Sequence, residues 1–176
     1  HIPDGSVPGD KISAYCEEYD RMARNLDMLV IGMGEAGQVG FNEAGTTPSS
    51  RTRTVLLSYQ SRKRQGKNFN GDFKHTPSEA ITVGIDTMMS AKKIILMAWG
   101  EDKANAVKQV VEHKADSDFP ASFLQNHKDI TCYVDETAAS LLTRVVSPWL
   151  VGPCEWTRKF IRKAVVWLCQ EVHKPI

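Results

Sequence analysis

Several features are scarce or missing in this chain of 176 residues, and each absence excludes a class of protein. No apolar run approaches the roughly 18 residues that a transmembrane helix requires, and no signal peptide opens the chain, so no membrane partner is expected. Charge of one sign is not in excess: 22 basic and 21 acidic residues leave a net charge of +1, which gives no general attraction to nucleic acid.

Closely spaced cysteines are also lacking. Cys16, Cys132, Cys154 and Cys169 form no CxxC pair and no metal-ligand spacing, which favours reduced thiols in a cytoplasmic protein. What the chain does have is an ordinary apolar content of 41%, and at this length about 70% of the unfolded surface can be buried without staples. It opens with His1 and a turn-rich stretch, so we expect a longer native protein.

The hydrophobic pattern alternates between helical and extended segments. Apolar residues at three- and four-residue steps predict helices over 11–25, 101–113 and 136–145, with helical turns at 86–91 and 122–127. Apolar or β-branched runs predict strands at 28–34, 52–59, 80–85, 93–99 and 130–134, and 60–78 is expected to be a loop or short helix. This order predicts an α/β fold with an open, mostly parallel Rossmann-like sheet and flanking helices.

The pattern changes after residue 146, where Pro148 and Pro153 interrupt it. We therefore divide the chain into an α/β domain at 1–146 and a linker with a C-terminal amphipathic helix at 147–176. A partner helix or the body of the domain is expected to cover the apolar stripe of that helix, and a membrane-surface helix is the alternative. The stripe consists of Trp156, Phe160, Ala164, Trp167 and Leu168, and the opposite side carries Arg158, Lys159, Arg162 and Lys163.

A glycine-rich segment follows the first predicted strand. Residues 32–37 read GMGEAG and satisfy the dinucleotide pattern GxGxxG. Two features argue against a nucleotide: Gly40, Gly45 and Pro48 prevent a helix from starting there, and no acidic residue lies between Glu43 and Asp72 to bind a ribose. The glycines instead suit the close approach of backbone amides to a small polar ligand.

The longer string IGMGEAGQVGFNEAGTTPSSRTR resembles the signature of the glucosamine-6-phosphate deaminase/isomerase family, in which a run like GxGxDGHIxFNEPxS is followed by SRTR. The segments AITVGIDTMMSAKKIILMAWGEDKANAV and FLQNHKDITCYVDETAA resemble later family motifs, so the resemblance covers about residues 1–143. It implies conversion of glucosamine 6-phosphate to fructose 6-phosphate and ammonia, without a cofactor. It also implies that the enolising Asp and a phosphate loop of the family lie before His1.

The chain departs from the family at two catalytic positions. The Asp and His of the DGH triplet are Ala36 and Gln38, and the Glu that supports the His is retained as Glu43. Gln38 can bind a hydroxyl but exchanges no proton near neutral pH, and loss of acid–base assistance typically costs ~10²- to 10⁴-fold in rate per group. Glu43 without its partner would equally serve as an ordinary carboxylate that caps the loop amides.

The resemblance also implies binding residues. Loop amides at Gly32, Gly34 and Gly40 would meet the substrate, and Lys103 and Lys67 would bind its phosphate, with Arg64 as the fallback for Lys67. Lys103 has the alternative role of a solvated helix lysine. Thr46, Thr47 and Arg53 match an allosteric phosphate site of some relatives, although Val55 and Leu56 replace the Lys-Thr pair expected beyond them.

These observations predict an impaired glucosamine-6-phosphate isomerase/deaminase. The alternatives are a non-catalytic sugar-phosphate-binding or regulatory domain and a 6-phosphogluconolactonase-like hydrolase. The expected ligand is glucosamine 6-phosphate or fructose 6-phosphate; relatives suggest a homo-oligomer, and the region around WLVGPCEWT weakly resembles a linker to a deacetylase-like domain. No metal site is expected, because His113 and His127 have no second ligand at metal spacing, and His127 is expected to make a structural hydrogen bond.

Overall fold

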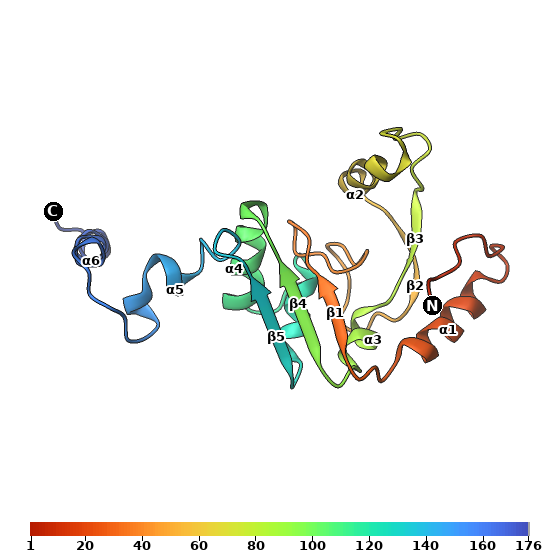
Figure 1. Ribbon diagram of the computed structural model, residues 1–176, viewed down its shortest axis with the longest axis horizontal. Helices are drawn as coiled ribbons and strands as arrows, with labels where there is room; N and C mark the ends of the chain where they lie inside the picture. Colours follow the sequence, from red (N-terminus) through yellow and green to blue (C-terminus); the bar gives the residue numbers. More distant parts are fainter. Residues whose placement is uncertain (176) are drawn as a thin grey trace.

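A computed structural model describes residues 1–175 and shows a mixed α/β fold built on a parallel sheet (Figure 1). Strands β1 (Leu29–Gly32), β4 (Ile94–Ala98) and β5 (Ile130–Val134) lie in the order β1-β4-β5. Both pairings are parallel, with Leu29 opposite Ile94 and Ile94 opposite Ile130. The predicted fold class is confirmed, and the carboxyl ends of all three strands point to one edge.

One face of this sheet carries the core. Strand alternation directs Ile94, Leu96 and Ala98 to that face, where they are buried against Val107 of α4 (Ala104–Glu112) and Leu124. Leu124 belongs to the 3-10 helix η3 (Pro120–Asn126), which contacts α3 (Ile85–Met89). The short 3-10 helix η2 (Glu101–Lys103) directly precedes α4. The helix predicted over 101–113 and both predicted helical turns are confirmed, with bounds that differ by one to three residues at each end.

The other face of the sheet is open among residues 1–175. Val30 of β1, Tyr133 of β5 and Trp99, one residue past β4, are each more than half exposed. Parallel sheets are normally covered on both faces. The described chain therefore presents an apolar sheet face that none of its own elements covers fully.

A two-stranded ribbon lies apart from the sheet. Strands β2 (Arg53–Leu56) and β3 (Glu79–Thr82) pair antiparallel, and α1 (Ile12–Ala23) lies against β2 (Figure 1). The connection between the two strands forms α2 (Tyr59–Gln65) and η1 (Gly66–Phe69), within the stretch predicted as a loop or short helix. The ribbon was not predicted, because the pattern of a single strand does not reveal its partner.

The segment after β5 differs from the prediction. The helix expected over 136–145 is wrong, since the structure has only α5 (Thr143–Val146). Backbone hydrogen bonds in this segment close over three residues, from the Ser140 N–H to the Thr137 carbonyl at 3.3 Å and from the Leu142 N–H to the Ala139 carbonyl at 3.0 Å, so the segment forms successive turns. Glu112 at the end of α4 then accepts the Thr143 N–H at 2.6 Å and ties α5 to the domain.

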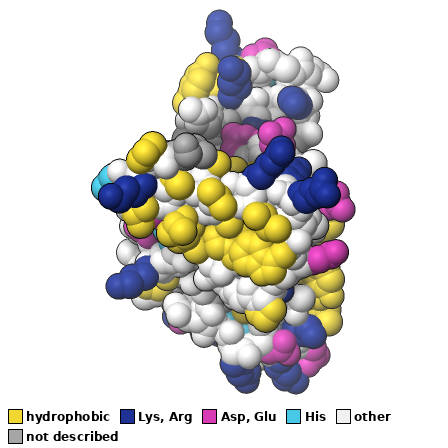
Figure 2. All heavy atoms as spheres, turned by 90° about the vertical axis from the view of Figure 1, so that its left-hand side faces the viewer, with side chains coloured by type: hydrophobic (Ala, Val, Ile, Leu, Met, Phe, Trp, Pro, Cys, Tyr) yellow, Lys and Arg dark blue, Asp and Glu magenta, His cyan; other side chains and the backbone are white. Residues whose placement is uncertain are grey.

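The C-terminal helix α6 (Arg158–Glu171) follows the turn η4 (Pro148–Leu150). The ring of Trp149 stacks on Trp156 with centroids 6.1 Å apart and meets Phe160 edge-on at 6.2 Å. Trp156 and Leu168 are more than half exposed, so the body of the domain does not cover this part of the apolar stripe, and cover by a partner helix stays a prediction. Figure 2 shows hydrophobic side chains gathered on this side of the molecule, with Lys and Arg beside them; the exposed apolar residues of α6 are Ile161, Val165 and Leu168.

Candidate functional site

The glycine-rich segment forms a tight bend at the carboxyl end of β1. The Met33 N–H donates to the Met97 carbonyl at 2.9 Å, which extends the sheet by one residue, and the Gly34 N–H donates to the Gln38 carbonyl at 2.9 Å. No helix starts between β1 and β2 in the described chain. The bend therefore lacks the helix N-terminus that a dinucleotide pyrophosphate requires.

Gln38 closes this bend. Its side chain is 9% exposed, and its Oε1 accepts the Ala36 N–H at 2.9 Å. A Cβ atom at Gly34 would lie 2.2 Å from the Gln38 Cδ, so a larger residue there would displace the carboxamide from its place over the bend. Oε1 is thus engaged within the loop, and Nε2 carries the N–H groups that can face a ligand.

A pocket of 230 Å³ opens over the bend. Its lining includes Arg64, the fallback phosphate cation, and none of its lining residues carries a carboxylate or an imidazole. The structure therefore brings together three predicted loop glycines, Gln38 and one cation. The lining residues are Gly32, Met33, Gly34, Gln38, Gly40, Phe41, Ser61, Arg64 and Gln65.

The three side chains expected to bind phosphate lie at different positions relative to the pocket. Arg64 of α2 forms an ion pair with Glu35 of the bend, and its side chain is 39% exposed. Lys103, in η2 just after β4, pairs with Asp102, and the pKa of Asp102 is lowered chiefly by the hydrogen bond from Lys103 and slightly by the charge of Arg64. Lys67 is exposed on η1 and does not line the pocket.

Glu43 lies outside the pocket lining. Its Oε2 accepts the N–H of Ser58, the N-cap residue of α2, at 3.2 Å. Its Oε1 is buried and has no hydrogen-bond partner within residues 1–175. Glu43 therefore contacts the start of α2 and keeps one free acceptor.

The residues matched to an allosteric site are only partly brought together. The Arg53 guanidinium donates to Asn42 Oδ1 at 3.0 Å and to Thr46 Oγ1 at 3.4 Å, and burial lowers the pKa of Arg53. Thr47 is exposed, and its hydroxyl contacts Ser49 instead. Thr46 and Arg53 thus form a pair without Thr47.

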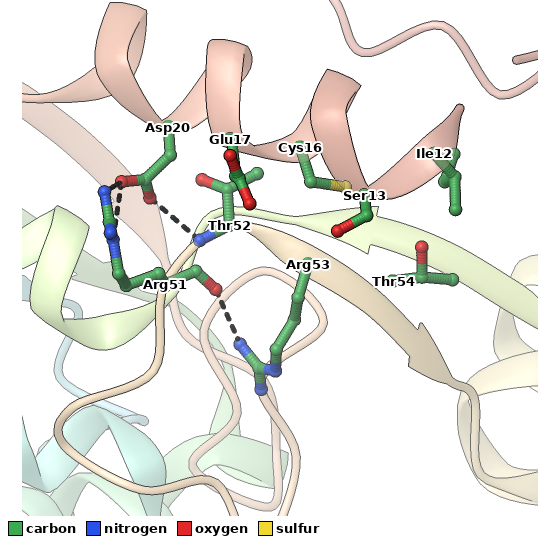
Figure 3. Close-up of a pocket in the computed structure, with 9 residues that line it drawn as sticks. All are labelled: Ile12, Ser13, Cys16, Glu17, Asp20, Arg51, Thr52, Arg53 and Thr54. Atoms are coloured by element: carbon green, nitrogen blue, oxygen red, sulfur yellow. Dashed lines mark hydrogen bonds and ion pairs between the residues drawn. The ribbon is translucent and has the colours of Figure 1, made fainter. Parts of the chain in front are cut away.

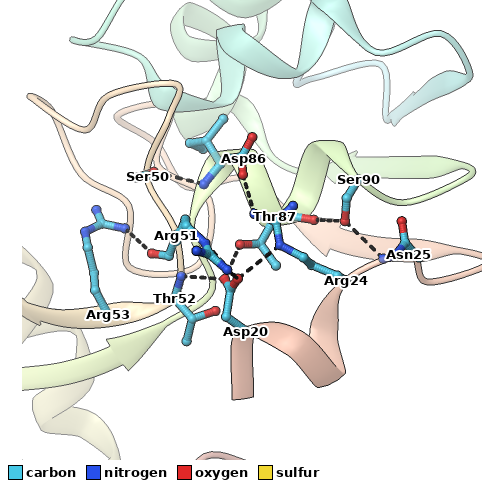
Figure 4. A network of polar contacts seen from close by, with 11 residues as sticks. Asp20, Arg24, Asn25, Ser50, Arg51, Thr52, Arg53, Asp86, Thr87 and Ser90 are labelled. Atoms are coloured by element: carbon cyan, nitrogen blue, oxygen red, sulfur yellow. Dashed lines mark hydrogen bonds and ion pairs between the residues drawn. The ribbon is translucent and has the colours of Figure 1, made fainter. Parts of the chain in front are cut away.

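A buried carboxylate that the sequence analysis missed organises the neighbouring elements (Figure 3 and Figure 4). Asp20 of α1 is 1% exposed. It accepts hydrogen bonds from Arg24 Nε at 3.1 Å, Arg51 Nη2 at 2.7 Å and the Thr52 N–H at 2.8 Å, and from the Thr87 hydroxyl. Burial raises the pKa of Asp20, but the hydrogen bonds from Thr87, Thr52 and Arg51 outweigh it and hold that pKa well below its usual range.

A signal for Asp20 was present in the sequence. It lies four residues after Cys16 on the buried face of α1, where a carboxylate requires an internal partner. That partner, Arg51, is 31 residues away and could not be identified from spacing. The first arginine of the SRTR string is thereby assigned a structural contact.

The remaining polar candidates have structural roles. His127 Nε2 donates to the Ala91 carbonyl at 2.7 Å and its Nδ1 accepts the Asp129 N–H at 3.1 Å, which confirms the expected structural hydrogen bond. Within residues 1–175, no cluster of three or more His, Cys, Asp or Glu side chains could hold a metal ion. In the same part of the chain, no helix has the length and apolar character needed to cross a membrane.

Comparison with known families adds to this geometry. The sequence model described as glucosamine-6-phosphate isomerases/6-phosphogluconolactonase matches residues 1–133. A glucosamine-6-phosphate deaminase-like protein of Bacteroides thetaiotaomicron is 42% identical over 177 residues, which cover 99% of this chain and 26% of that protein. Glucosamine-6-phosphate deaminase 1 of Bacillus subtilis is 39% identical over 143 residues, which cover 80% of this chain and 58% of that enzyme.

Solved structures agree with the sequence relatives. A monomeric glucosamine-6-phosphate deaminase superposes with a TM-score of 0.74 at 38% identity, over 80% of this chain and 58% of that one. The 6-phosphogluconolactonase of Trypanosoma brucei superposes over 79% of this chain and 57% of that one with a TM-score of 0.56 at 15% identity, a likeness of fold alone. The chain spans less than two thirds of the length of each of these relatives.

Proposed function

Because the chain belongs to the family of glucosamine-6-phosphate isomerases and 6-phosphogluconolactonases, we propose that its glycine-loop pocket binds glucosamine 6-phosphate or fructose 6-phosphate but supports deamination poorly. The observation that carries this proposal is the lining of the pocket. It contains a cation and a carboxamide, Arg64 and Gln38, and no carboxylate or imidazole.

The chemistry of an isomerase/deaminase requires proton transfer. Opening a sugar ring and moving a proton between adjacent carbons need groups that titrate near neutral pH. Gln38 can orient a hydroxyl through Nε2 but cannot take up or release a proton, and Ala36 offers only its backbone. Binding is therefore retained while the chemical step is slowed. The same observation favours the second candidate, a regulatory domain that binds a sugar phosphate without turning it over.

To bind the phosphate group of the ligand, Arg64 would exchange its ion pair with Glu35 for one with the phosphate. Arg64 is ion-paired with Glu35, so an incoming phosphate competes with one partly exposed carboxylate. Arginine binds phosphate through two parallel hydrogen bonds, which favours the exchange. Lys103, after the neighbouring strand, does not line the pocket and is paired with Asp102, so a phosphate contact from Lys103 would require that pair to open.

A thermal-shift titration tests binding. Glucosamine 6-phosphate and fructose 6-phosphate should raise the unfolding midpoint of the wild-type chain, because a ligand that binds only the native state stabilises it. Arg64→Ala should weaken the apparent affinity about 10-fold or more, since a charge-assisted contact is lost. Lys63→Ala, a change one residue earlier at an exposed site outside the pocket, is the matched control. No shift in the wild type, or the same affinity in Arg64→Ala, would refute the site.

An ammonia-release assay tests the impairment. The wild-type chain should release ammonia from glucosamine 6-phosphate far more slowly than the Bacillus subtilis deaminase, by ~10²-fold or more. Turnover by the wild type at the rate of that relative would contradict the proposal. Hydrolysis of 6-phosphogluconolactone, assayed in parallel, would instead support the lactonase alternative.

We also propose two partners, which rest on the family resemblance of the sequence alone. The chain self-associates, which light scattering across a dilution series measures. Its C-terminal segment leads into a deacetylase-like domain, which the sequence of the full-length gene would reveal. A strictly monomeric chain, or a different following domain, would contradict these two proposals separately.

A further inference from the structure

One side of helix α6 is apolar and is not covered by the described chain. This outer face consists of Ile161, Val165 and Leu168, which follow one another at steps of four and three residues and therefore share one side of the helix. Their side chains are 48%, 49% and 53% exposed. None of the three lines the groove that α6 forms with Trp149. The outer face is thus separate from the contacts that α6 makes within its own segment.

Two arginines lie beside the outer face. Arg158 and Arg162 precede Ile161 and Val165 by three residues, which makes them neighbours on the helix surface. Neither arginine forms an ion pair with a carboxylate of residues 1–175. Figure 2 shows Lys and Arg side chains next to the gathered hydrophobic ones. Arginine is enriched at protein interfaces, so this face fits a protein surface that offers an apolar groove with carboxylates at its edge.

The relatives indicate where such a surface would come from. The family model ends at residue 133, so α6 lies beyond it. The match to the Bacteroides thetaiotaomicron protein covers 99% of this chain, α6 included, but only 26% of that protein. Since the matched 177 residues are about a quarter of it, the part outside the match is longer than a typical domain of roughly 50–250 residues. A counterpart of α6 therefore occurs in a polypeptide with room for further domains.

We propose that the outer face of α6 docks onto a further domain of the same polypeptide, in an apolar groove edged by Asp or Glu side chains. A second copy of α6 fits less well, because it would bring Arg158 and Arg162 close to the same arginines of the partner helix. The inference deepens the second partner proposed above, the following domain, by naming the surface that receives it. It does not depend on sugar-phosphate binding.

Hydrogen–deuterium exchange tests the docking in the full-length gene product and in the 176-residue chain. Docking should slow exchange of the amides of residues 158–171 about 10-fold or more in the full-length protein, because a packed helix opens less often. Leu168→Asp should remove this protection, and Gln170→Asp, the same new charge on the opposite side of α6, should keep it. In the 176-residue chain both variants should unfold at the same midpoint, since both positions are exposed.

The outcomes separate this inference from the earlier proposals. A full-length protein in which residues 158–171 exchange as fast as in the 176-residue chain would overturn the docking, even where a following domain is present. Protection that Arg162→Glu leaves unchanged would overturn the acidic edge. Self-association of the 176-residue chain in light scattering, or its co-sedimentation with phosphatidylglycerol vesicles, would assign the outer face to a second copy or to lipid if Leu168→Asp abolished it, and either result would refute the inference.

Discussion

Asp20 shows how a single carboxylate joins elements that are distant in the sequence. Its two oxygens accept hydrogen bonds from Arg24 on its own helix, from Arg51 and Thr52 at the start of the ribbon and from Thr87 of α3. Removal of one member of a buried charged network leaves its partners unsatisfied. We therefore expect Asp20 to matter more to stability than any exposed ion pair.

Replacement of Asp20 by Asn tests this at the residue scale. The variant keeps the shape but loses the charge, so its free energy of unfolding in urea should fall by about 3 kcal/mol at neutral pH. Asp27→Asn, which breaks the exposed pair with Lys92, should change little. Equal effects of the two substitutions would contradict the central role of Asp20.

The pH dependence of stability follows from the same carboxylate. The pKa of Asp20 is lower in the folded chain than the ordinary value of about 4 in the unfolded chain. The stabilisation is therefore present above pH ~4 and is lost as the pH falls toward the folded pKa, since the unfolded state binds the proton first. Urea unfolding measured below pH ~4 should show a steeper decline for the wild type than for Asp20→Asn.

Some of these functional and structural residues could be predicted from the sequence, and others could not. The glycine bend was predictable because Gly32, Gly34 and Gly37 stand in a fixed local pattern after a strand. Asp20 and its partner Arg51 were not, because their contact depends on how α1 packs beside β2. Arg64 was named only as a fallback, since a polar loop gives no register, and the three-dimensional packing of α2 decided that it and not Lys67 lines the pocket.

At the scale of elements, the start of α3 is held against the loop before β2. Ser50 provides its carbonyl to the Asp86 N–H at 2.9 Å and its hydroxyl to the Ile85 N–H at 3.0 Å. Gly84 is the residue that permits this contact, because a Cβ there would lie 2.1 Å from the Ser50 carbonyl oxygen. The atoms that this Cβ would meet belong to the backbone of Ser50 and Arg51, so no flexible side chain can move aside to relieve the clash.

Gly84→Ala should therefore be strongly destabilising. We expect a loss of about 2–4 kcal/mol in the free energy of unfolding, because one of the two backbone segments must shift. Gly9→Ala, where nothing lies within 4 Å of the added atom, is the matched control and should be neutral or slightly stabilising. A neutral Gly84→Ala in thermal unfolding would show that the contact yields easily.

Element types followed from local patterns better than element pairing did. The central strand and helices α1 and α4 have clear periods and were predicted close to their observed bounds. The helix expected over 136–145 is absent because the backbone there forms successive three-residue turns, such as the one from Thr137 to Ser140. The ribbon of β2 and β3 escaped prediction because its strands are joined across 22 residues of α2, η1 and loop.

At the scale of the whole molecule, the C-terminal segment is attached through few contacts. Trp149 contacts Trp156 and Phe160 within the segment, and the Thr143–Glu112 hydrogen bonds precede it. We expect a chain that ends at Val146 to remain folded, with a free energy of unfolding within about 1 kcal/mol of the full chain. Urea unfolding followed by circular dichroism measures this, and loss of a cooperative transition would show that 147–176 is part of the core.

A tryptophan on the open face of the sheet allows its coverage to be followed by fluorescence. Trp99 is 53% exposed and shares the strand alternation of Met97 on that face. Any polypeptide that comes to lie over the sheet must strip water from this indole and move its fluorescence emission toward the blue. In a chain shortened to residue 146, Trp99 is the sole tryptophan left, so a blue shift of the emission would report the binding of a polypeptide over this face of the sheet.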